Sequence, residues 1–291
     1  MVRPTQLGLV VAIAGNGLLL ALWRSPRASE ELGAAALALA LLLIAAMAVH
    51  LANEAADDET DRLSRRTPFS GGSGALAASD MGPRVPLAIS LSMAAIVTLA
   101  AAASTITGLL SPLAGVLLWL GLAGGLAYSL PPFEAMRRGW GETLNAVLGG
   151  LLLPLFMLSA LAGTVTAVDV LAFTPFLLVV FASVMATAWP DRAADAATGK
   201  ATMQVRLKPA TLRRIHALAA AGFVAATFVV AAAAAMPLAL AGLLVTPLLV
   251  MGTARYTRTE SPLANVGAMV GLALITTVTL SISLWTRTGS L

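Results

Sequence analysis

The sequence contains no cysteine, and charged residues make up only 11% of its 291 residues. Without cysteine, disulfides, thiolate metal sites and cysteine nucleophiles are excluded. Hydrophobic residues make up 58% of the chain and the mean hydropathy is +0.89, so a soluble globule would expose too much apolar surface. The composition therefore predicts an integral membrane protein.

Long apolar runs are what the chain has instead. About nine of them approach the roughly 20 residues that a membrane-spanning helix requires. They do not alternate polar and apolar residues as barrel strands do, so we predict an all-α integral membrane protein that forms one domain over residues 1–291. The predicted spans are 7–23, 33–52, 86–104, 108–128, 143–163, 171–189, 212–234, 236–252 and 263–285.

Basic residues indicate the orientation of these spans. With a cytoplasmic N-terminus, fifteen of the 18 Lys and Arg residues lie on the cytoplasmic side, and the other three are Arg24, Arg27 and Arg287. Because Lys and Arg accumulate in cytoplasmic loops, this predicts a multi-pass cell-membrane protein with its N-terminus and charged loops in the cytoplasm. The sequence pI of 10.3 then reflects this orientation and not nucleic-acid binding, since there is no soluble basic domain. Arg3 before the first run also suits a signal peptide, but the length of the run favours an uncleaved span.

Two acidic clusters begin where long apolar runs end. Asn53, Asp57 and Asp61 follow the second run, and Asp191 and Asp195 follow the sixth. Spacing by four advances a helix by about 40° beyond one turn, so each cluster shares a helix face. Acidic side chains beside membrane spans often mark a functional site, and opposed carboxylates suit Mg²⁺ that also binds substrate phosphates. The alternative is that these acids are solvated helix ends that pair with nearby arginines.

Basic residues follow both acidic clusters. Arg66 follows the first, Lys200 and Arg206 follow the second, and Arg137 with Arg138 forms a third group. Their charge suits phosphate oxygens that a metal leaves uncovered, and Arg66 and Lys200 are the main candidates. The enrichment of cytoplasmic loops in arginine explains the same residues without a phosphate contact.

Three polar residues near the fourth and fifth runs are further candidates. Tyr128 and Ser129 end the fourth run on the side of the acidic clusters, and Asn145 lies early in the fifth. Tyr128 either reaches the same cavity or anchors the chain at the membrane interface, and Asn145 either contacts an acceptor or joins two helices. The glycine-rich stretch 67–74 either surrounds an anion with backbone N–H groups or is a linker.

Together these motifs resemble the UbiA superfamily of intramembrane prenyltransferases, and the nine-helix count agrees over nearly the whole chain. The segment at residues 128–132 is similar to the one after the fourth helix of that family, and stretch 67–73 is similar to segments of its quinone-pathway and archaeal members. The two family signatures, N-x-x-x-D-x-x-x-D and D-x-x-x-D followed by G-K-x-T, are matched by Asn53, Asp57 and Asp61 and by Asp191, Asp195, Gly199, Lys200 and Thr202.

The resemblance implies a helical bundle around a central cavity that opens to the cytoplasmic side and to the bilayer. It implies that Mg²⁺ and a prenyl diphosphate bind between the acidic motifs, and that the allylic diphosphate ionises before the prenyl group reaches a lipophilic acceptor. The metal ligands would be Asn53, Asp57, Asp61, Asp191 and Asp195. The catalytic residues would be Asp57, Asp61, Asp191, Asp195 and Lys200. Substrate would contact Asn53, Arg66, Tyr128, Ser129, Arg137, Arg138 and Asn145.

The chain departs from the family pattern at one position, and the resemblance leaves more than one acceptor possible. Some members carry lysine where this chain has Pro132, so Arg137 or Arg138 is the candidate replacement. The predicted acceptor is an aromatic quinone precursor, and a glyceryl phosphate lipid or a tetrapyrrole is the alternative; no obligate protein partner is expected.

A CDP-alcohol phosphatidyltransferase would need an Asp-Gly-x-x-Ala-Arg element, which the sequence lacks. A cation-coupled transporter would place its acids at mid-membrane on broken helices, and here they cluster at the ends of the runs.

Overall fold

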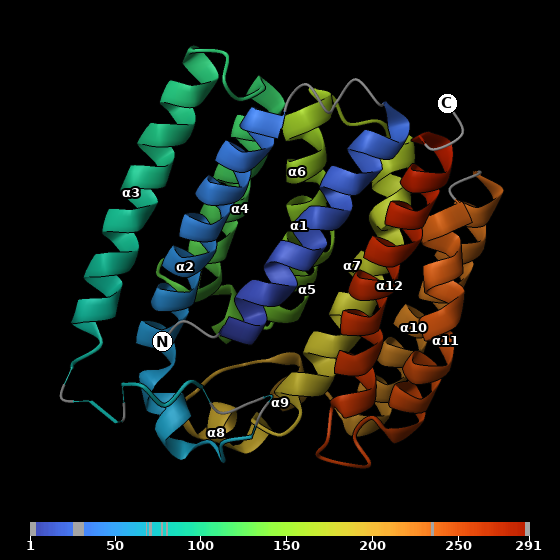
Figure 1. Cartoon of the computed structure of the whole chain (residues 1–291). Coiled ribbons are helices and arrows are strands. Elements are labelled where there is room, and N and C mark those ends of the chain that lie inside the picture. Colours follow the sequence, from blue (N-terminus) through green and yellow to red (C-terminus); the bar gives the residue numbers. More distant parts are fainter. Residues whose placement is uncertain are drawn as a thin grey trace.

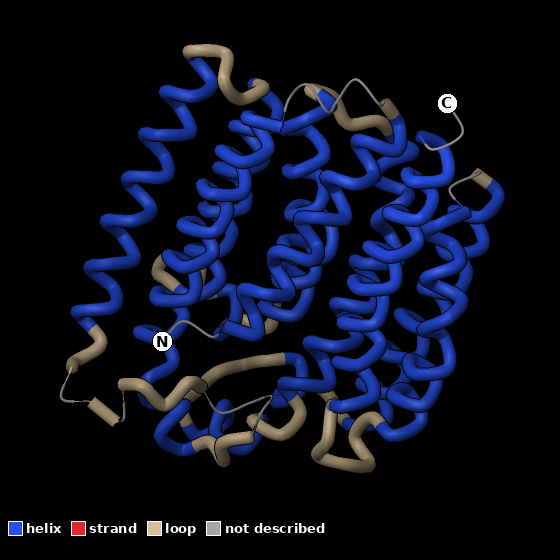
Figure 2. Tube along the Cα trace, viewed as in Figure 1, coloured by secondary structure: helices blue, strands red, loops and turns tan. Residues whose placement is uncertain are grey.

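The computed structural model describes residues 4–25, 32–67, 69, 72–76, 78–79, 81–233 and 236–288. Within these ranges the chain is helical and has no strand (Figures 1 and 2). Nine of the described helices are long and apolar enough to cross a membrane. The predicted all-α class and the predicted number of spans are therefore confirmed. Arg3 and Arg27, which entered the count of basic residues, lie outside the described ranges.

The nine spans follow the predicted order along the chain. Two short helices, α8 (Arg192–Ala197) and α9 (Met203–Arg206), lie below the long helices in Figure 1, at the end of the bundle where α1 begins. The long helices are α1 (Pro4–Arg24), α2 (Leu32–Leu63), α3 (Arg84–Ile106), α4 (Pro112–Ser129), α5 (Gly141–Val147) continued by α6 (Leu153–Ala162), α7 (Ala167–Ala188), α10 (Pro209–Ala232), α11 (Met236–Arg255) and α12 (Leu263–Thr288).

The start of the fourth span differs from the prediction. α4 begins at Pro112 and not at residue 108, because Gly108 has a φ of 77° and turns the chain. The Ser111 side chain then accepts a hydrogen bond from the Ala114 backbone N–H at 3.1 Å, and proline occupies the first helical position. Hydropathy extends through this turn because Leu109 and Leu110 are apolar, so the run alone does not show where the helix starts.

The fifth span is interrupted by a π-helical turn, Leu148–Leu152, between α5 and α6. Its two glycines face different ways. A Cβ atom on Gly150 would lie 2.6 Å from the Cα atom of Leu177, so this glycine lets the turn pack against the backbone of α7. A Cβ atom on Gly149 would lie 3.9 Å from Asn145 Oδ1 and from Val180 Cγ1, which is ordinary van der Waals contact, so position 149 has room for a Cβ atom. Single π turns are frequent at functional sites, and this one lies midway along its span.

The edges of the bundle carry the exposed apolar side chains. Leu99 and Ile106 on α3 are 72% and 85% exposed, and Leu244 and Val250 on α11 are also exposed. In Figure 1, α3 lies at one edge of the bundle and α11 at the other. Exposure of these apolar side chains would be unfavourable in water and is favourable in contact with lipid chains. These faces of the bundle therefore fit a bilayer.

The contact between α1 and α6 depends on a glycine. A Cβ atom at position 17 would lie 2.0 Å from the carbonyl oxygen of Pro154, which is backbone and has little freedom to move. We expect Gly17→Ala to lower the free energy of unfolding by about 1–3 kcal/mol, because the two helices must separate. Thermal unfolding of the purified chain in detergent measures this as a lower midpoint.

The matched control for that substitution is on the same helix. A Cβ atom at Gly15 would meet no atom within 4 Å. Gly15→Ala should therefore leave the midpoint unchanged or raise it slightly, since alanine is the better helix former. Equal midpoints for the two variants would contradict the close approach of α1 and α6.

Candidate active site

The first acidic motif lies on the last three turns of α2, which has 32 residues and continues beyond its apolar run. Asn53 Nδ2 donates a hydrogen bond to Asp57 Oδ2 at 3.0 Å, as expected for side chains four apart on one helix face. Asn53, Asp57 and Asp61 all line the same cavity. Asp58 is on another face of α2, where Arg62 donates two hydrogen bonds to it at 3.2 Å.

The second acidic motif is built differently from the first. α7 ends at Ala188, and Asp191 is the N-cap residue of the separate short helix α8. The predicted sixth span, 171–189, thus ends within one residue of the end of α7, and the motif lies on a helix of its own. The backbone N–H of Asp195 donates to the carbonyl of Asp191 at 2.9 Å, which places the two residues one helical turn apart. Both line the cavity that the first motif lines.

Asp195 is buried, with 6% of its surface exposed. Burial raises the pKa of Asp195 to about 6, against the opposing effect of the positive charge on Lys200. The Thr202 hydroxyl donates a hydrogen bond to Asp195 Oδ2 at 3.3 Å. With a pKa of about 6, this carboxyl group is mostly ionised at neutral pH and can therefore bind a cation.

Lys200 joins the two acidic motifs. Its Nζ atom lies 2.5 Å from Asp57 Oδ1 and 3.7 Å from Asp195 Oδ1, and its side chain is 6% exposed. Residues 57 and 200 are 143 positions apart in the chain. One buried ammonium group therefore bridges carboxylates from α2 and α8, so the motifs face each other across a short distance.

The cavity that these residues line has a volume of about 760 Å³, which is within the usual range for a small-molecule site. Its polar end contains the acidic motifs and Lys200. The other end is lined by apolar side chains from α1, α2, α4 and α6, among them Ile13, Leu42, Leu118 and Phe156. The cavity can therefore hold a molecule with a charged head and an apolar tail.

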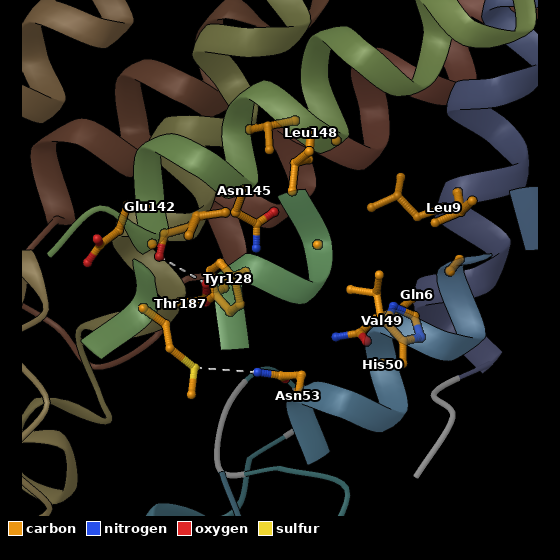
Figure 3. A pocket seen from close by; sticks show the side chains of 18 of the residues that line it. Gln6, Leu9, Val49, His50, Asn53, Tyr128, Glu142, Asn145, Leu148 and Thr187 are labelled. Carbon is orange, nitrogen blue, oxygen red and sulfur yellow. Dashed lines mark hydrogen bonds between the residues drawn. The ribbon is translucent and has the colours of Figure 1, made fainter. Parts of the chain in front are cut away.

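Tyr128 and Asn145 lie beside each other at the border between the polar and apolar ends. Their side chains are hydrogen-bonded, and both line the cavity. Figure 3 shows them on the same side of Asn53, with Leu148 farther from Asn53. Ser129 is buried, and its hydroxyl accepts a hydrogen bond from Asn53 Nδ2 at 3.4 Å.

The predicted arginines lie outside the lining of this cavity. Arg66 is exposed, and its guanidinium donates to the carbonyl of Gly74 at 3.5 Å. Arg137 donates to the carbonyl of Thr198 at 3.2 Å, and its own carbonyl accepts from the Ala201 N–H at 2.8 Å. Arg138 is exposed. Arg137 thus ties the loop after α4 to the loop that carries Lys200, and direct phosphate contacts by the three arginines stay a prediction.

The glycine-rich stretch after α2 is described only in part, because Pro68, Ser70 and Gly71 lie outside the described residues. Phe69 and Gly72 line the cavity. Gly72 has a φ of 68°, and a Cβ atom there would lie 1.6 Å from Asp61 Oδ2. The described part of the stretch therefore lies directly against the first acidic motif, and the positive φ at position 72 favours glycine.

The comparisons with known proteins agree with this geometry. The model of the UbiA prenyltransferase family matches residues 9–283 of the chain. The chain belongs to the UbiA prenyltransferase family. The expectation of a prenyltransferase is thereby confirmed at the level of the family. The comparison with curated protein sequences finds no match.

Solved structures of UbiA homologues share the fold of this family member. The apo structure of a UbiA homologue from Aeropyrum pernix K1 is 20% identical, with a TM-score of 0.71 over 99% of this chain and 100% of that chain. A UbiA homologue from Archaeoglobus fulgidus bound to GPP and Mg²⁺ is 16% identical, with a TM-score of 0.63 over 95% of this chain and 98% of that chain. The same homologue bound to DMAPP and Mg²⁺ gives a TM-score of 0.62 at 16% identity, over 95% of this chain and 97% of that chain.

The side chains of this UbiA protein fit a divalent cation. All the predicted ligands present oxygen atoms, which Mg²⁺ prefers, and the space between Asp57 and Asp195 already accommodates one positive group, the Lys200 ammonium. Among the described residues, no three His, Cys, Asp or Glu side chains form a complete metal cage. Mg²⁺ does not need such a cage, because it typically binds one or two carboxylates and completes its coordination shell with substrate phosphates and water.

Glu142 is a residue of the site that the sequence interpretation missed. It is 3% exposed, lines the cavity, and its Oε1 atom accepts a hydrogen bond from the Met203 N–H at 3.1 Å. It therefore ties the start of α5 to α9, just beyond Lys200. The predicted span began at residue 143, which left this acid in a loop. A span that started at Gly141 would have shown a carboxylate in the first turn of a membrane helix, which is itself a signal of function.

Proposed function

We propose that this protein transfers a prenyl group from a prenyl diphosphate, held with Mg²⁺ between the two acidic motifs, to a lipophilic acceptor. The observation that carries the proposal is that Asp57, Asp191 and Asp195 line one cavity whose other end is apolar. A charged diphosphate suits the polar end, and a prenyl chain suits the apolar end. The Archaeoglobus fulgidus homologue was solved with GPP and Mg²⁺ and with DMAPP and Mg²⁺, which supports the same kind of substrate here.

The residue roles follow from charge. Asn53, Asp57, Asp61, Asp191 and Asp195 would hold the metal and the diphosphate. Mg²⁺, when bound, would stabilise negative charge on the diphosphate as it leaves. Lys200 adds a positive charge near the diphosphate, and a charge that is oriented before the carbon–oxygen bond breaks costs little reorganisation during the reaction.

The apolar end of the cavity protects the reactive carbon. Ionisation of an allylic diphosphate leaves a carbocation, which water would capture. Leu118, Leu122 and Phe156 present only hydrocarbon to the cavity, so they would hold the prenyl chain and exclude water. Tyr128 and Asn145 lie at the border between the two ends and would contact the substrate where the carbon–oxygen bond breaks.

We infer an aromatic quinone precursor as the acceptor, on the similarity of the stretch at residues 67–73 to segments of quinone-pathway and archaeal family members. A glyceryl phosphate lipid or a tetrapyrrole is the alternative. The position of Phe69 and Gly72 in the cavity lining supports a role for this stretch in the choice of acceptor.

We also infer that residues 1–291 act as one transmembrane prenyltransferase domain in the cell membrane, without an obligate protein partner. The family match over residues 9–283 supports a single domain. The excess of Lys and Arg around α8, α9 and the loop after α2 supports a cytoplasmic position for the polar end of the cavity.

A transfer assay tests the proposed function. The purified chain in detergent is incubated with labelled geranylgeranyl diphosphate, Mg²⁺ and a panel of lipophilic acceptors. We expect diphosphate release that depends on one acceptor class, stops when a chelator removes the metal, and returns when Mg²⁺ is added in excess. Transfer that is unaffected by the chelator would contradict the metal site, and release without any acceptor would contradict prenyl transfer.

A further inference from the structure

The buried ammonium group of Lys200 is the counter-ion of two carboxylates, Asp57 and Asp195. The chain has only two lysines, Lys200 and Lys208. Lys208 is exposed at the N-cap of α10, whereas the Lys200 side chain is 6% exposed and touches two carboxylates. Burial of an ammonium group is costly unless it is paired, and here the pairing is with Asp57 and Asp195. The same pairing relieves the repulsion between the two facing carboxylates.

The backbone around Lys200 is held on both sides. Its N–H donates to the carbonyl of Asp195 at 2.9 Å, and the next residue, Ala201, donates to the carbonyl of Arg137 at 2.8 Å. Gly199 has a φ of 73°, which allows the tight turn between α8 and Lys200. The ammonium group can therefore change its partners by rotation of the side chain, without movement of the loop.

The position of the ammonium group conflicts with that of a metal ion. A divalent cation bound to Asp57 and Asp195 would meet the positive charge that lies 2.5 Å from Asp57 Oδ1 and 3.7 Å from Asp195 Oδ1. Like charges at such distances repel strongly in a partly buried site. The metal and the ammonium group therefore compete for the same oxygen atoms.

We propose that Lys200 competes with Mg²⁺ for Asp57 and Asp195, so that the metal binds tightly only together with the diphosphate. This inference rests on the proposed function. The diphosphate supplies new oxygen acceptors to which the ammonium group turns when it leaves the carboxylates. The two ligands thereby help each other to bind, and the true substrate of the site is the complex of diphosphate and metal.

The size of this coupling can be stated. Coupling between two ligands commonly changes affinity by about 5-fold to 150-fold, and it is reciprocal. In the wild-type chain, Mg²⁺ should bind more weakly alone than with a prenyl thiolodiphosphate, an unreactive analogue, by a factor in this range. In Lys200→Met, Mg²⁺ alone should bind more tightly than in the wild type by a similar factor, because the competing charge is gone.

Isothermal titration of the full chain in detergent tests the proposal, with Mg²⁺ alone and with Mg²⁺ in the presence of geranylgeranyl thiolodiphosphate. Lys208→Met is the matched control, and it should bind Mg²⁺ as the wild type does. Equal affinity of Lys200→Met and the wild type for Mg²⁺ alone, with both binding the analogue and metal together, would overturn the competition and leave prenyl transfer intact. If neither chain bound the analogue with Mg²⁺, the proposed function itself would fail.

The wild-type titrations keep the proposal testable if Lys200→Met does not fold. They need no variant, since competition predicts that the analogue strengthens Mg²⁺ binding in the unaltered protein. Equal affinity for Mg²⁺ with and without the analogue would overturn it. Lys200→Gln offers a second variant that removes the charge and keeps a hydrogen-bond donor for Asp57.

Discussion

Asp57→Asn is expected to lower the catalytic efficiency of prenyl transfer by at least about 100-fold, the size of effect seen when one group that stabilises developing charge is removed. The substitution keeps the shape of the side chain and removes its charge. Asp57 is the residue of the first motif that contacts Lys200, at 2.5 Å, and it also accepts a hydrogen bond from Asn53. The loss should appear in diphosphate release and in product formation alike, measured with purified protein in detergent.

The neighbouring aspartate is the control for this prediction. Asp58 is the next residue of α2, and its carboxylate pairs with Arg62 on another face of the helix. Exposed ion pairs of this kind contribute little to stability, so Asp58→Asn should retain wild-type activity. Full activity in Asp57→Asn, or equal losses in the two variants, would show that the acidic motif does not bind the diphosphate.

A bulky side chain at position 149 is expected to change the choice of prenyl chain length. Gly149 is in the π turn and lines the cavity, and a Cβ atom there would make only ordinary van der Waals contacts at 3.9 Å. It lies about 12 Å deeper than Gly141 by the rise of the helix. In Gly149→Leu, catalytic efficiency with geranylgeranyl diphosphate should fall about tenfold or more, and efficiency with dimethylallyl diphosphate should change little, since a lost apolar contact or a clash of this size is worth at least about 1.4 kcal/mol.

The same assay contains its own control. Gly8 on α1 is exposed, does not line the cavity and has no atom within 4 Å of a Cβ position. Gly8→Leu should therefore leave the ratio of the two efficiencies as it is in the wild type. A loss in Gly149→Leu that is equal for short and long prenyl groups would place the π turn beside the acceptor and contradict its assignment to the prenyl chain.

Hydropathy predicted the spans because a bilayer imposes one requirement on all of them, a continuous apolar run. The spacing by four residues placed Asn53, Asp57 and Asp61 on one helix face, and in the structure all three line the cavity. Hydropathy also placed the end of the sixth span at residue 189, one residue beyond the end of α7, and Pro190 favours such an end because proline has no N–H to donate to the preceding helical turn. The sequence did not predict that Asp191 and Asp195 lie on the separate short helix α8, because that depends on how this segment packs against the rest of the chain.

The roles of Lys200 and Arg137 show where sequence patterns stop being informative. Both are basic residues in loops on the same side of the bundle, and composition treats them alike. Their difference comes from contacts between distant residues. Lys200 meets Asp57, 143 positions away, and Arg137 meets the carbonyl of Thr198, 61 positions away. Such pairings depend on how the helices pack in the bundle, so they cannot be predicted from a single sequence.

The length of α2 sets the depth at which the reaction takes place. From Gly33 to Asn53 the helix rises about 30 Å, which equals the hydrocarbon thickness of a bilayer. Asp57 and Asp61 then stand about 6 and 12 Å farther along the axis, level with the lipid headgroups. A prenyl diphosphate dissolved in the leaflet already carries its anion at that level and its chain in the hydrocarbon. It can therefore move from lipid to protein within one plane, and its charge never has to cross the oily interior.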